Sequence, residues 1–242
     1  MRLKLDLIVA VGSGDIRAVK EMTAAIPIVM VQGGDPVASG FVASLARPGG
    51  NITGLSTLRP ELSGKRMELL KEIVPQLSRV AVIAITYDQD YKQIQKEVDL
   101  AAGASGVKLQ YLEVRQSKDI EIAFRGAKKA RADAVLFRVA GPFIGSQRPQ
   151  IAEFAVKSTL PVIYERAAEA EAGGLMSDGI DINNQYHRAA TYVDKILKGA
   201  KPADLPVEQS TKFEFIINLK TAKQIGITIP PNVLARADKV IR

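Results

Sequence analysis

The chain has 242 residues, of which 47% are apolar and 24% are charged, with no cysteine and a single histidine. This composition is that of a folded globular protein and excludes a disordered chain or a small disulfide-stapled scaffold. It also excludes thiol nucleophiles, cysteine-ligated metals and histidine-rich metal sites, so no metal or other cofactor is expected. The net charge of +7 comes from Lys and Arg residues scattered along the chain. This scatter favours a solvated surface over a nucleic-acid partner.

Strand-like apolar runs alternate with helix-like segments along most of the chain. The expected strands are 7–11, 26–31, 52–56, 80–85, 107–114, 134–139, 161–164 and 213–217, with a connecting strand at 173–176. The expected helices are 15–24, 37–46, 63–73, 91–104, 118–130, 147–157, 184–197, 219–225 and a last one from Pro230-Pro231 to Ile241. Strands separated by helices predict βαβ units with parallel pairing. Because the strands fall into groups before about 57 and after about 79, we expect two α/β lobes.

No targeting or membrane-spanning segment is visible in this sequence. No apolar run approaches 18 residues, so no transmembrane helix is predicted. The first nine residues are not a signal peptide, because their apolar stretch is brief and includes Asp6.

The first candidate site is the glycine-containing turn Gly12-Ser13-Gly14, which follows a strand and opens a helix. Backbone N–H groups at a helix N-terminus bind anions, and glycine allows close approach. Asp35, after Gly34 at the end of the next strand, extends the likeness to a dinucleotide fingerprint. That fingerprint is incomplete, because Arg17 stands where its third glycine belongs. A plain tight turn, a small carboxylate site and a dinucleotide site therefore all stay open, and Asp35 is expected to cap the next helix, to contact ligand, or both.

Further polar groups follow strands in the second half of the chain. They are Tyr87 and Asp88 in 86–89, Ala140 and Gly141 in 139–142, and Tyr164 after Val162-Ile163. In open α/β sheets, ligands lie outside the carboxyl ends of strands, so these groups are expected around one cleft. No catalytic motif accompanies them, and the chain is not expected to be an enzyme.

Six stretches of this sequence resemble one known family. They are 35–37, 45–56, 63–72, 189–199, 212–222 and 237–241, and the run from Arg47 to Gly54 (Arg-Pro-Gly-Gly-Asn-Ile-Thr-Gly) is the most specific. The chain resembles, over essentially its whole length, the substrate-binding component of bacterial ABC transporters, in the group related to tryptophan- and tyrosine-type uptake proteins.

The resemblance implies a type I periplasmic binding fold, in which two Rossmann-like lobes with parallel sheets close on a ligand by a hinge. Residues 1–57 and about 178–208 would form a discontinuous first lobe, 58–177 the second, and 209–242 a C-terminal part of unassigned lobe. The ligand would be a small polar or carboxylate-bearing molecule, an amino acid or aromatic acid, in the interlobe cleft. The site residues carried over are those of the two candidate sites above together with Asp178. A membrane permease partner and an extracytoplasmic location are also implied.

The sequence departs from the family pattern in three places. Gly141 replaces a usual Asp before proline, Asp178-Gly179 replaces a common Tyr-Gly pair, and a signal peptide and two strand–helix units are missing before Leu5. The first lobe is therefore expected to be incomplete. Its strand 5–11 would then be an exposed sheet edge where a second copy pairs to form a homodimer. A nucleotide-dependent α/β enzyme using Gly12 to Gly14, or a ligand-sensing regulatory domain, are the alternative functions.

Overall fold

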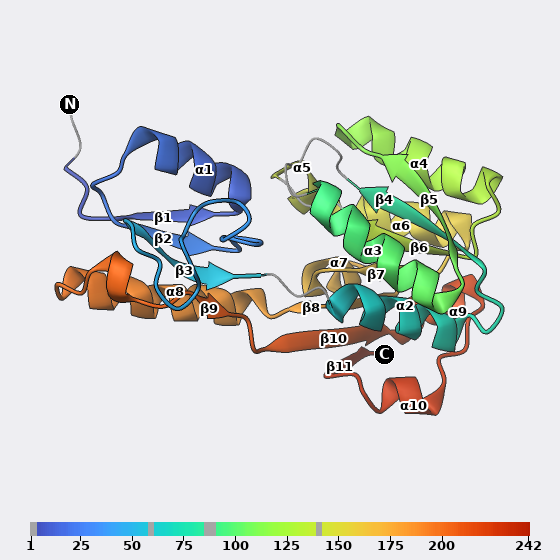
Figure 1. The fold of residues 1–242 in the computed structure, drawn as a ribbon. Helices are drawn as coiled ribbons and strands as arrows, with labels where there is room; N and C mark the ends of the chain where they lie inside the picture. The colour runs from blue at the N-terminus through green and yellow to red at the C-terminus, as the bar shows by residue number, and fades with distance from the viewer. Residues whose placement is uncertain (1–3, 58–60, 85–90, 139–141) are drawn as a thin grey trace. The chain divides into compact units, whose positions relative to one another are not determined.

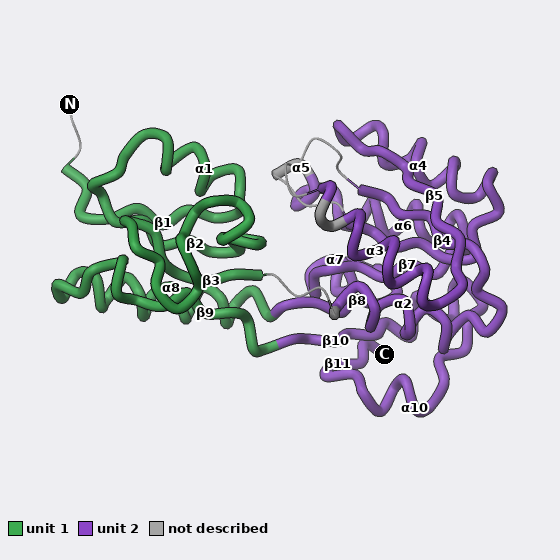
Figure 2. Tube along the Cα trace, viewed as in Figure 1, with its two compact units in different colours: residues 1–58, 181–212 green, residues 59–180, 213–242 purple. Residues whose placement is uncertain are grey.

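The computed structural model describes residues 4–57, 61–84, 91–138 and 142–242. The chain divides into two compact units (Figure 2). Unit 1 comprises 1–58 and 181–212, and unit 2 comprises 59–180 and 213–242. The chain therefore passes from one unit to the other three times. Of the C-terminal part 209–242, whose lobe the sequence left unassigned, residues 209–212 lie in unit 1 and 213–242 in unit 2.

Unit 1 is built on a parallel sheet of four strands in the order β1-β2-β3-β9. The strands are β1 (Ile8–Val11), β2 (Ile28–Val31), β3 (Ile52–Ser56) and β9 (Glu208–Gln209). Its helices are α1 (Ser13–Met22) and α8 (Ile182–Leu197), with a short 3-10 helix at Pro202–Asp204. All four residues of β2 are buried, as expected for a central strand covered on both faces.

Two small apolar clusters hold helices against the two faces of this sheet. Ile16 of α1 packs with Ile28, Met30 and Ile52 on one face. On the other face, Ala189, Tyr192 and Ile196 of α8 pack with Val29, Val31 and Leu55. The alternation of β2 side chains between the two clusters follows from the two-residue period of a strand. Figure 1 shows α1 and α8 on opposite sides of β1 to β3.

Unit 2 is built on a seven-stranded sheet in the order β11-β10-β8-β7-β6-β4-β5. The strands are β4 (Arg79–Ala84), β5 (Lys108–Glu113), β6 (Ala134–Arg138), β7 (Val162–Tyr164), β8 (Met176–Ile180), β10 (Phe213–Asn218) and β11 (Lys239–Ile241). The helices are α2 (Glu61–Ile73), α3 (Tyr91–Ser105), α4 (Ser117–Lys129), α5 (Pro142–Gly145), α6 (Arg148–Ser158), α7 (Ala167–Glu171), α9 (Leu219–Ile225) and α10 (Pro231–Leu234). Pairing is parallel except between β10 and β8, which are antiparallel.

Helices cover both faces of the sheet of unit 2 (Figure 1). Helices α2, α3, α9 and α10 pack on one face, over Val82, Leu136 and Ile163. Helices α4 and α6 pack on the other, over Ile83 and Phe137. Strands covered on both faces carry the continuous apolar runs that the sequence shows.

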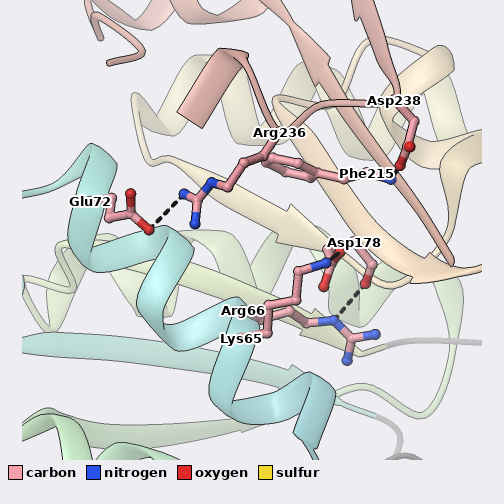
Figure 3. Close-up of polar contacts among 7 residues, drawn as sticks. All are labelled: Lys65, Arg66, Glu72, Asp178, Phe215, Arg236 and Asp238. Atoms are coloured by element: carbon pink, nitrogen blue, oxygen red, sulfur yellow. Dashed lines mark hydrogen bonds and ion pairs between the residues drawn. The ribbon is translucent and has the colours of Figure 1, made fainter. Parts of the chain in front are cut away.

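Two expected helices are wrong. Residues 37–46 form turns and bends instead of a helix. The carbonyl groups of Asp35 and Pro36 accept hydrogen bonds from N–H groups of the next few residues, and the side chains of Phe41 and Val42 then pack in the core. The last helix does not run to Ile241 but ends at Leu234. Asp238 then exchanges hydrogen bonds with the backbone of Phe215, which aligns β11 beside β10 (Figure 3). The connecting strand lies at Met176–Ile180 rather than 173–176, and α5 and α7 were not predicted.

Candidate functional site

The carboxyl ends of β1, β2 and β3 lie together at one edge of the unit 1 sheet, because the three strands are parallel and in register. Gly12 and Ser13 follow β1, the turn 32–35 follows β2, and Thr57 follows β3. The sequence predicted the first two segments and missed Ser56 and Thr57. The signal that would have found them is the polar pair that ends the apolar run of β3.

Gly12 is the N-cap residue of α1 and adopts a positive φ of 85°, a conformation that glycine adopts at little cost. Its N–H donates to the Val31 carbonyl at 2.8 Å, which ties the turn to β2. Gly12 has no side chain that could cap α1, and the helix therefore begins at the edge with its N-terminal amides. Ser13 begins this turn half-buried, while a Cβ on exposed Gly14 would meet nothing within 4 Å.

Gly34 and Asp35 are largely engaged within unit 1. The Gly34 N–H donates to Thr57 Oγ1 at 3.2 Å, and its carbonyl accepts from Ser56 Oγ at 2.6 Å. Asp35 Oδ1 accepts from the N–H groups of Val37 and Ala38 at 3.1 and 2.9 Å. Asp35 therefore does cap the following segment, although that segment is a turn and not the expected helix.

Of the sites expected in unit 2, four residues (Tyr87, Asp88, Ala140 and Gly141) lie outside the described residues, and their part in a site stays a prediction. Tyr164 corrects an expectation. Its side chain is 1% exposed and packs against the Phe137 ring at 5.3 Å between centroids, inside the cluster under α4 and α6. The reason is the strand alternation, which turns Tyr164 to the core and the next residue, Glu165, to the α2 face.

Three charged side chains stand at one level across neighbouring strands of unit 2. Phe137 pairs with Tyr164, and Tyr164 pairs with Ser177, so the residues that follow them share one row. That row is Arg138 and Glu165, at the carboxyl ends of β6 and β7, and Asp178, in the middle of β8. By the same alternation, they lie on the face that α2 covers.

Helix α2 completes the cluster. The Arg66 Nη1 group donates to Glu165 Oε1 at 2.7 Å, and its Nε group donates to the Asp178 carbonyl at 2.7 Å. Arg138 Nη2 lies 2.9 Å from the same Glu165 oxygen. Lys65 pairs with the fully buried carboxylate of Asp178, as Figure 3 shows. We call these five residues (Lys65, Arg66, Arg138, Glu165 and Asp178) the charged row.

The electrostatics of the charged row are those of a buried ion-pair network. Burial raises the pKa of Glu165, but the guanidinium groups of Arg138 and Arg66 outweigh it and hold that pKa below its ordinary value. Burial lowers the pKa of Arg138, an effect that Glu165 opposes. Glu165 is therefore a fixed anion at neutral pH.

The sequence prediction missed Arg66, Arg138 and Glu165. A usable signal was present, because Arg138 and Glu165 each end an apolar strand run, where ligand-contacting residues gather in parallel sheets. Asp178 was predicted, and the structure places it inside this network at 0% exposure. Among the residues that the structure describes, no group of His, Asp or Glu side chains forms a metal site, and no helix is long and apolar enough to cross a membrane.

Two α/β units with mainly parallel sheets, joined by three passages of the chain, define the class of two-lobed type I periplasmic binding proteins. The model of the family described as "ABC transporter substrate binding protein" matches residues 2–241. The chain belongs to that family.

Three relatives illustrate the similarity. A tyrosine-binding protein of Clostridioides difficile (strain R20291) is 29% identical over 225 residues, which are 93% of this chain. The chain spans 64% of the length of that relative. A conserved domain protein of Vibrio cholerae has 30% identity and a TM-score of 0.89, and an ABC domain in complex with L-Trp, from Streptococcus pneumonia, has 28% and 0.87. Each of these two similarities covers 98% of this chain and 79% of the solved chain.

Proposed function

We propose that this chain is the solute-binding component of an ABC-type uptake transporter and that it binds an amino acid or aromatic acid. The observation that carries the proposal is the family match across 2–241, together with relatives described as tyrosine-binding and as an L-Trp complex. The nucleotide-dependent enzyme is not favoured, because the family is one of binding proteins.

The ligand contacts proposed in unit 1 are the N-terminal amides of α1 and the Ser13 hydroxyl. The N-terminus of α1 at a sheet edge, with glycine as its N-cap residue, supports this assignment, since helix N-termini attract a carboxylate. Gly34 has a smaller role, because both its backbone groups are bonded to Ser56 and Thr57.

Isothermal titration with L-tyrosine and L-tryptophan tests the proposal, with ATP and NAD as negative probes. A probe at 100 times its Kd should stabilise the fold by about 2.7 kcal/mol in a thermal scan. Recovery of the unchanged amino acid after incubation is expected, because no reaction is proposed. Binding of ATP or NAD without amino-acid binding would overturn the proposal.

The unit 1 contact has its own test. Ser13→Ala should weaken binding by about tenfold or more, since a hydrogen bond to a charged group is worth about 1.5–3 kcal/mol. Ser44→Ala is the matched control, because the Ser44 hydroxyl bonds within its own turn at Arg47. Equal affinities of the two variants would remove Ser13 from the site.

A membrane partner and a location are also part of the proposal. A membrane permease would receive the loaded protein, and the working location would be extracytoplasmic, as the family membership suggests. Copurification with the permease of the same transport system, stronger with ligand than without, is the expected result.

A second copy of the chain is proposed to pair along β1. Among the described strands β1 pairs only with β2, which makes it an edge, and Val9 on it is 45% exposed. Val9→Lys should shift the protein toward monomer in light scattering. Val37→Lys, at a residue 43% exposed outside the strands, should leave the mass unchanged. A monomeric wild-type chain would refute this pairing.

A further inference from the structure

Strand β5 is an open edge of the unit 2 sheet, since among the described strands it pairs only with β4 (Figure 1). The N–H groups at its two ends, those of Lys108 and Val114, donate to carbonyls on the β4 side. Backbone groups alternate in direction along a strand, so those of Leu109, Tyr111 and Glu113 point away from β4. No described residue bonds to them. The outer side of β5 therefore offers three donors and three acceptors to a further strand.

An exposed apolar side chain lies beside this edge on its α4 side. A Cβ on Gly126 would meet Leu112 Cδ2 at 3.3 Å, so α4 rests against β5 at this point. Ile122 comes one helical turn before Gly126 and hence lies on the same side of α4. Its side chain is 55% exposed. Ile122 thus offers apolar surface next to the open strand.

The α3 side of the edge has a comparable feature. The Tyr111 hydroxyl donates to Asp99 Oδ1 at 2.7 Å, which places this side of α3 against β5. A shallow hollow here is lined by Asp99, Leu100 and Gly103 together with two lysines. The Leu100 side chain is 66% exposed. Because side chains of an added strand alternate between the two faces, they would meet apolar surface on each side.

The charges around the edge are unbalanced. None of the lysines of α3, β5 and α4 forms an ion pair with a described residue; they are Lys92, Lys96, Lys108, Lys118, Lys128 and Lys129. The carboxylates nearest to β5 are already engaged. Glu113 pairs with Arg115, and Asp119 accepts from the N–H groups of Arg115 and Gln116. The edge is therefore basic, which repels a second copy of itself and attracts an acidic strand.

We propose that the β5 edge is a docking site for an extended, acidic segment of a partner protein, which joins the unit 2 sheet beside β5. The backbone groups of Leu109, Tyr111 and Glu113 supply the hydrogen bonds, and the surrounding lysines select for acidic side chains. This surface is the lateral edge of the sheet and not the carboxyl edge. The inference goes beyond solute binding and does not depend on it.

The experiment titrates fluorescent hexapeptides into the full chain and follows their anisotropy. The probe alternates glutamate and valine, one comparison peptide alternates lysine and valine, and another is the probe with every amide N-methylated. The probe should bind at least about tenfold more tightly than either comparison, because only the probe has both the charge and the N–H donors. Equal binding of the methylated peptide would mean charge attraction alone and overturn strand addition. Equal binding of single-stranded oligothymidylate, or no binding of the probe, would overturn the proposal as well.

Hydrogen exchange locates the bound probe. The probe should slow exchange at the amides of Leu109, Tyr111 and Glu113, which face the added strand. Protection at Val9 on the β1 edge, without protection on β5, would contradict the assignment.

Charge reversal tests the role of the lysines. The double variant Lys108→Glu, Lys129→Glu should weaken binding of the probe by about tenfold or more. Its control is Lys220→Glu, Lys223→Glu, which makes the same charge change on exposed residues of α9. Equal losses in the two double variants would show only the effect of net charge and overturn the site. Ile122→Ser, which alters no charge, should weaken binding severalfold, and unchanged affinity in all these variants would also refute the proposal.

Discussion

The two units share one architecture but end their strands with different chemistry. At the carboxyl edge of unit 1, the groups are backbone amides, the hydroxyls of Ser13, Ser56 and Thr57, and one carboxylate, that of Asp35, which caps its own turn. At the corresponding edge of unit 2, the described groups are the ionised side chains of the charged row. The edge of unit 1 thus offers mainly the dipoles of backbone amides and hydroxyl groups. The edge of unit 2 offers charged side chains, whose stability depends on their ion-pair partners.

This difference predicts how much stability each edge loses when one side chain is substituted. A neutral hydrogen bond is worth about 0.5–1.5 kcal/mol, so the edge of unit 1 tolerates single side-chain changes. A buried ion pair that loses one partner leaves an uncompensated charge, which costs about 3–5 kcal/mol. The edge of unit 2 should therefore be far more sensitive to substitution.

The largest effect is expected where backbones approach most closely, and it should be equal in the two units. A Cβ at Gly179 would lie 1.8 Å from the Glu165 carbonyl oxygen, and one at Gly54 would lie 2.3 Å from that of Met30. Gly179→Ala and Gly54→Ala should each cost about 4 kcal/mol or more in urea denaturation. Gly14→Ala, with open space around its Cβ, is the control and should be neutral or slightly stabilising. A tolerated Gly179→Ala would contradict the packing of β8 on Glu165.

The next effect separates the units. Arg66→Met removes one of the two arginine partners of Glu165 together with the donor to the Asp178 carbonyl. The loss of these two charged hydrogen bonds should lower the free energy of unfolding by about 3–5 kcal/mol. Ser56→Ala is the unit 1 counterpart, because it removes the bond from the buried Ser56 Oγ to the Gly34 carbonyl at 2.6 Å. It should cost about 0.5–1.5 kcal/mol. Similar losses for the two variants would refute the contrast between the edges.

A smaller effect depends on pH. Partial burial raises the pKa of Asp133, but the N–H groups of Ser78 and Arg79 and the Ser78 hydroxyl lower it overall. A lowered folded-state pKa gives stability that is present above the unfolded value of about 3.9 and lost as pH falls through the folded value. Asp133→Asn should therefore cost about 1–3 kcal/mol at pH 7 and less at pH 2.

The control for this variant is Asp194→Asn, which alters an exposed pair with Lys198 and should cost under about 0.5 kcal/mol at either pH. A loss in Asp133→Asn that does not change with pH would show that the carboxylate charge is not what stabilises β4 and β6.

The smallest effect is expected at Asp35 of unit 1. Asp35→Ala removes the bonds to Val37 and Ala38 and should cost about 1 kcal/mol, with a modest loss of affinity for L-tyrosine or L-tryptophan. A thermal scan and a titration measure the two effects separately. A loss above about 3 kcal/mol would mean that this turn anchors unit 1 more firmly than its bonds indicate.

Most of the fold was predictable because it is encoded locally. The apolar runs at Ile8–Val11, Ile28–Val31 and Ala134–Arg138 become parallel strands, and the amphipathic segment at Ile182–Leu197 becomes a helix. The errors arose where tertiary pairing decides. The residues after Leu234 include no glycine or proline that would end a helix. They nevertheless form a strand beside β10, because Asp238 bonds to the backbone of Phe215.

The groups at the carboxyl edge of unit 1 were easier to find from the sequence, because glycine and polar residues directly follow strands there. In unit 2, the sequence analysis selected Tyr164 as a site residue and not its neighbour Glu165. Because side chains alternate along a strand, Tyr164 faces the cluster under α4 and α6 and Glu165 faces α2. A single apolar run of three residues, as in β7, does not reveal which of its faces meets which helix.

The sequence by itself therefore determined the alternation of strands and helices, the two groups of βαβ units, the turn at Gly12 and the family resemblance. Periodicity and turn chemistry act over a few residues, so they can be read without the fold. Only the tertiary structure brought Arg66, Arg138 and Glu165 together, across about a hundred positions of sequence. Their contact depends on strand order and register, because a one-residue slip of β7 would turn Glu165 into the opposite core.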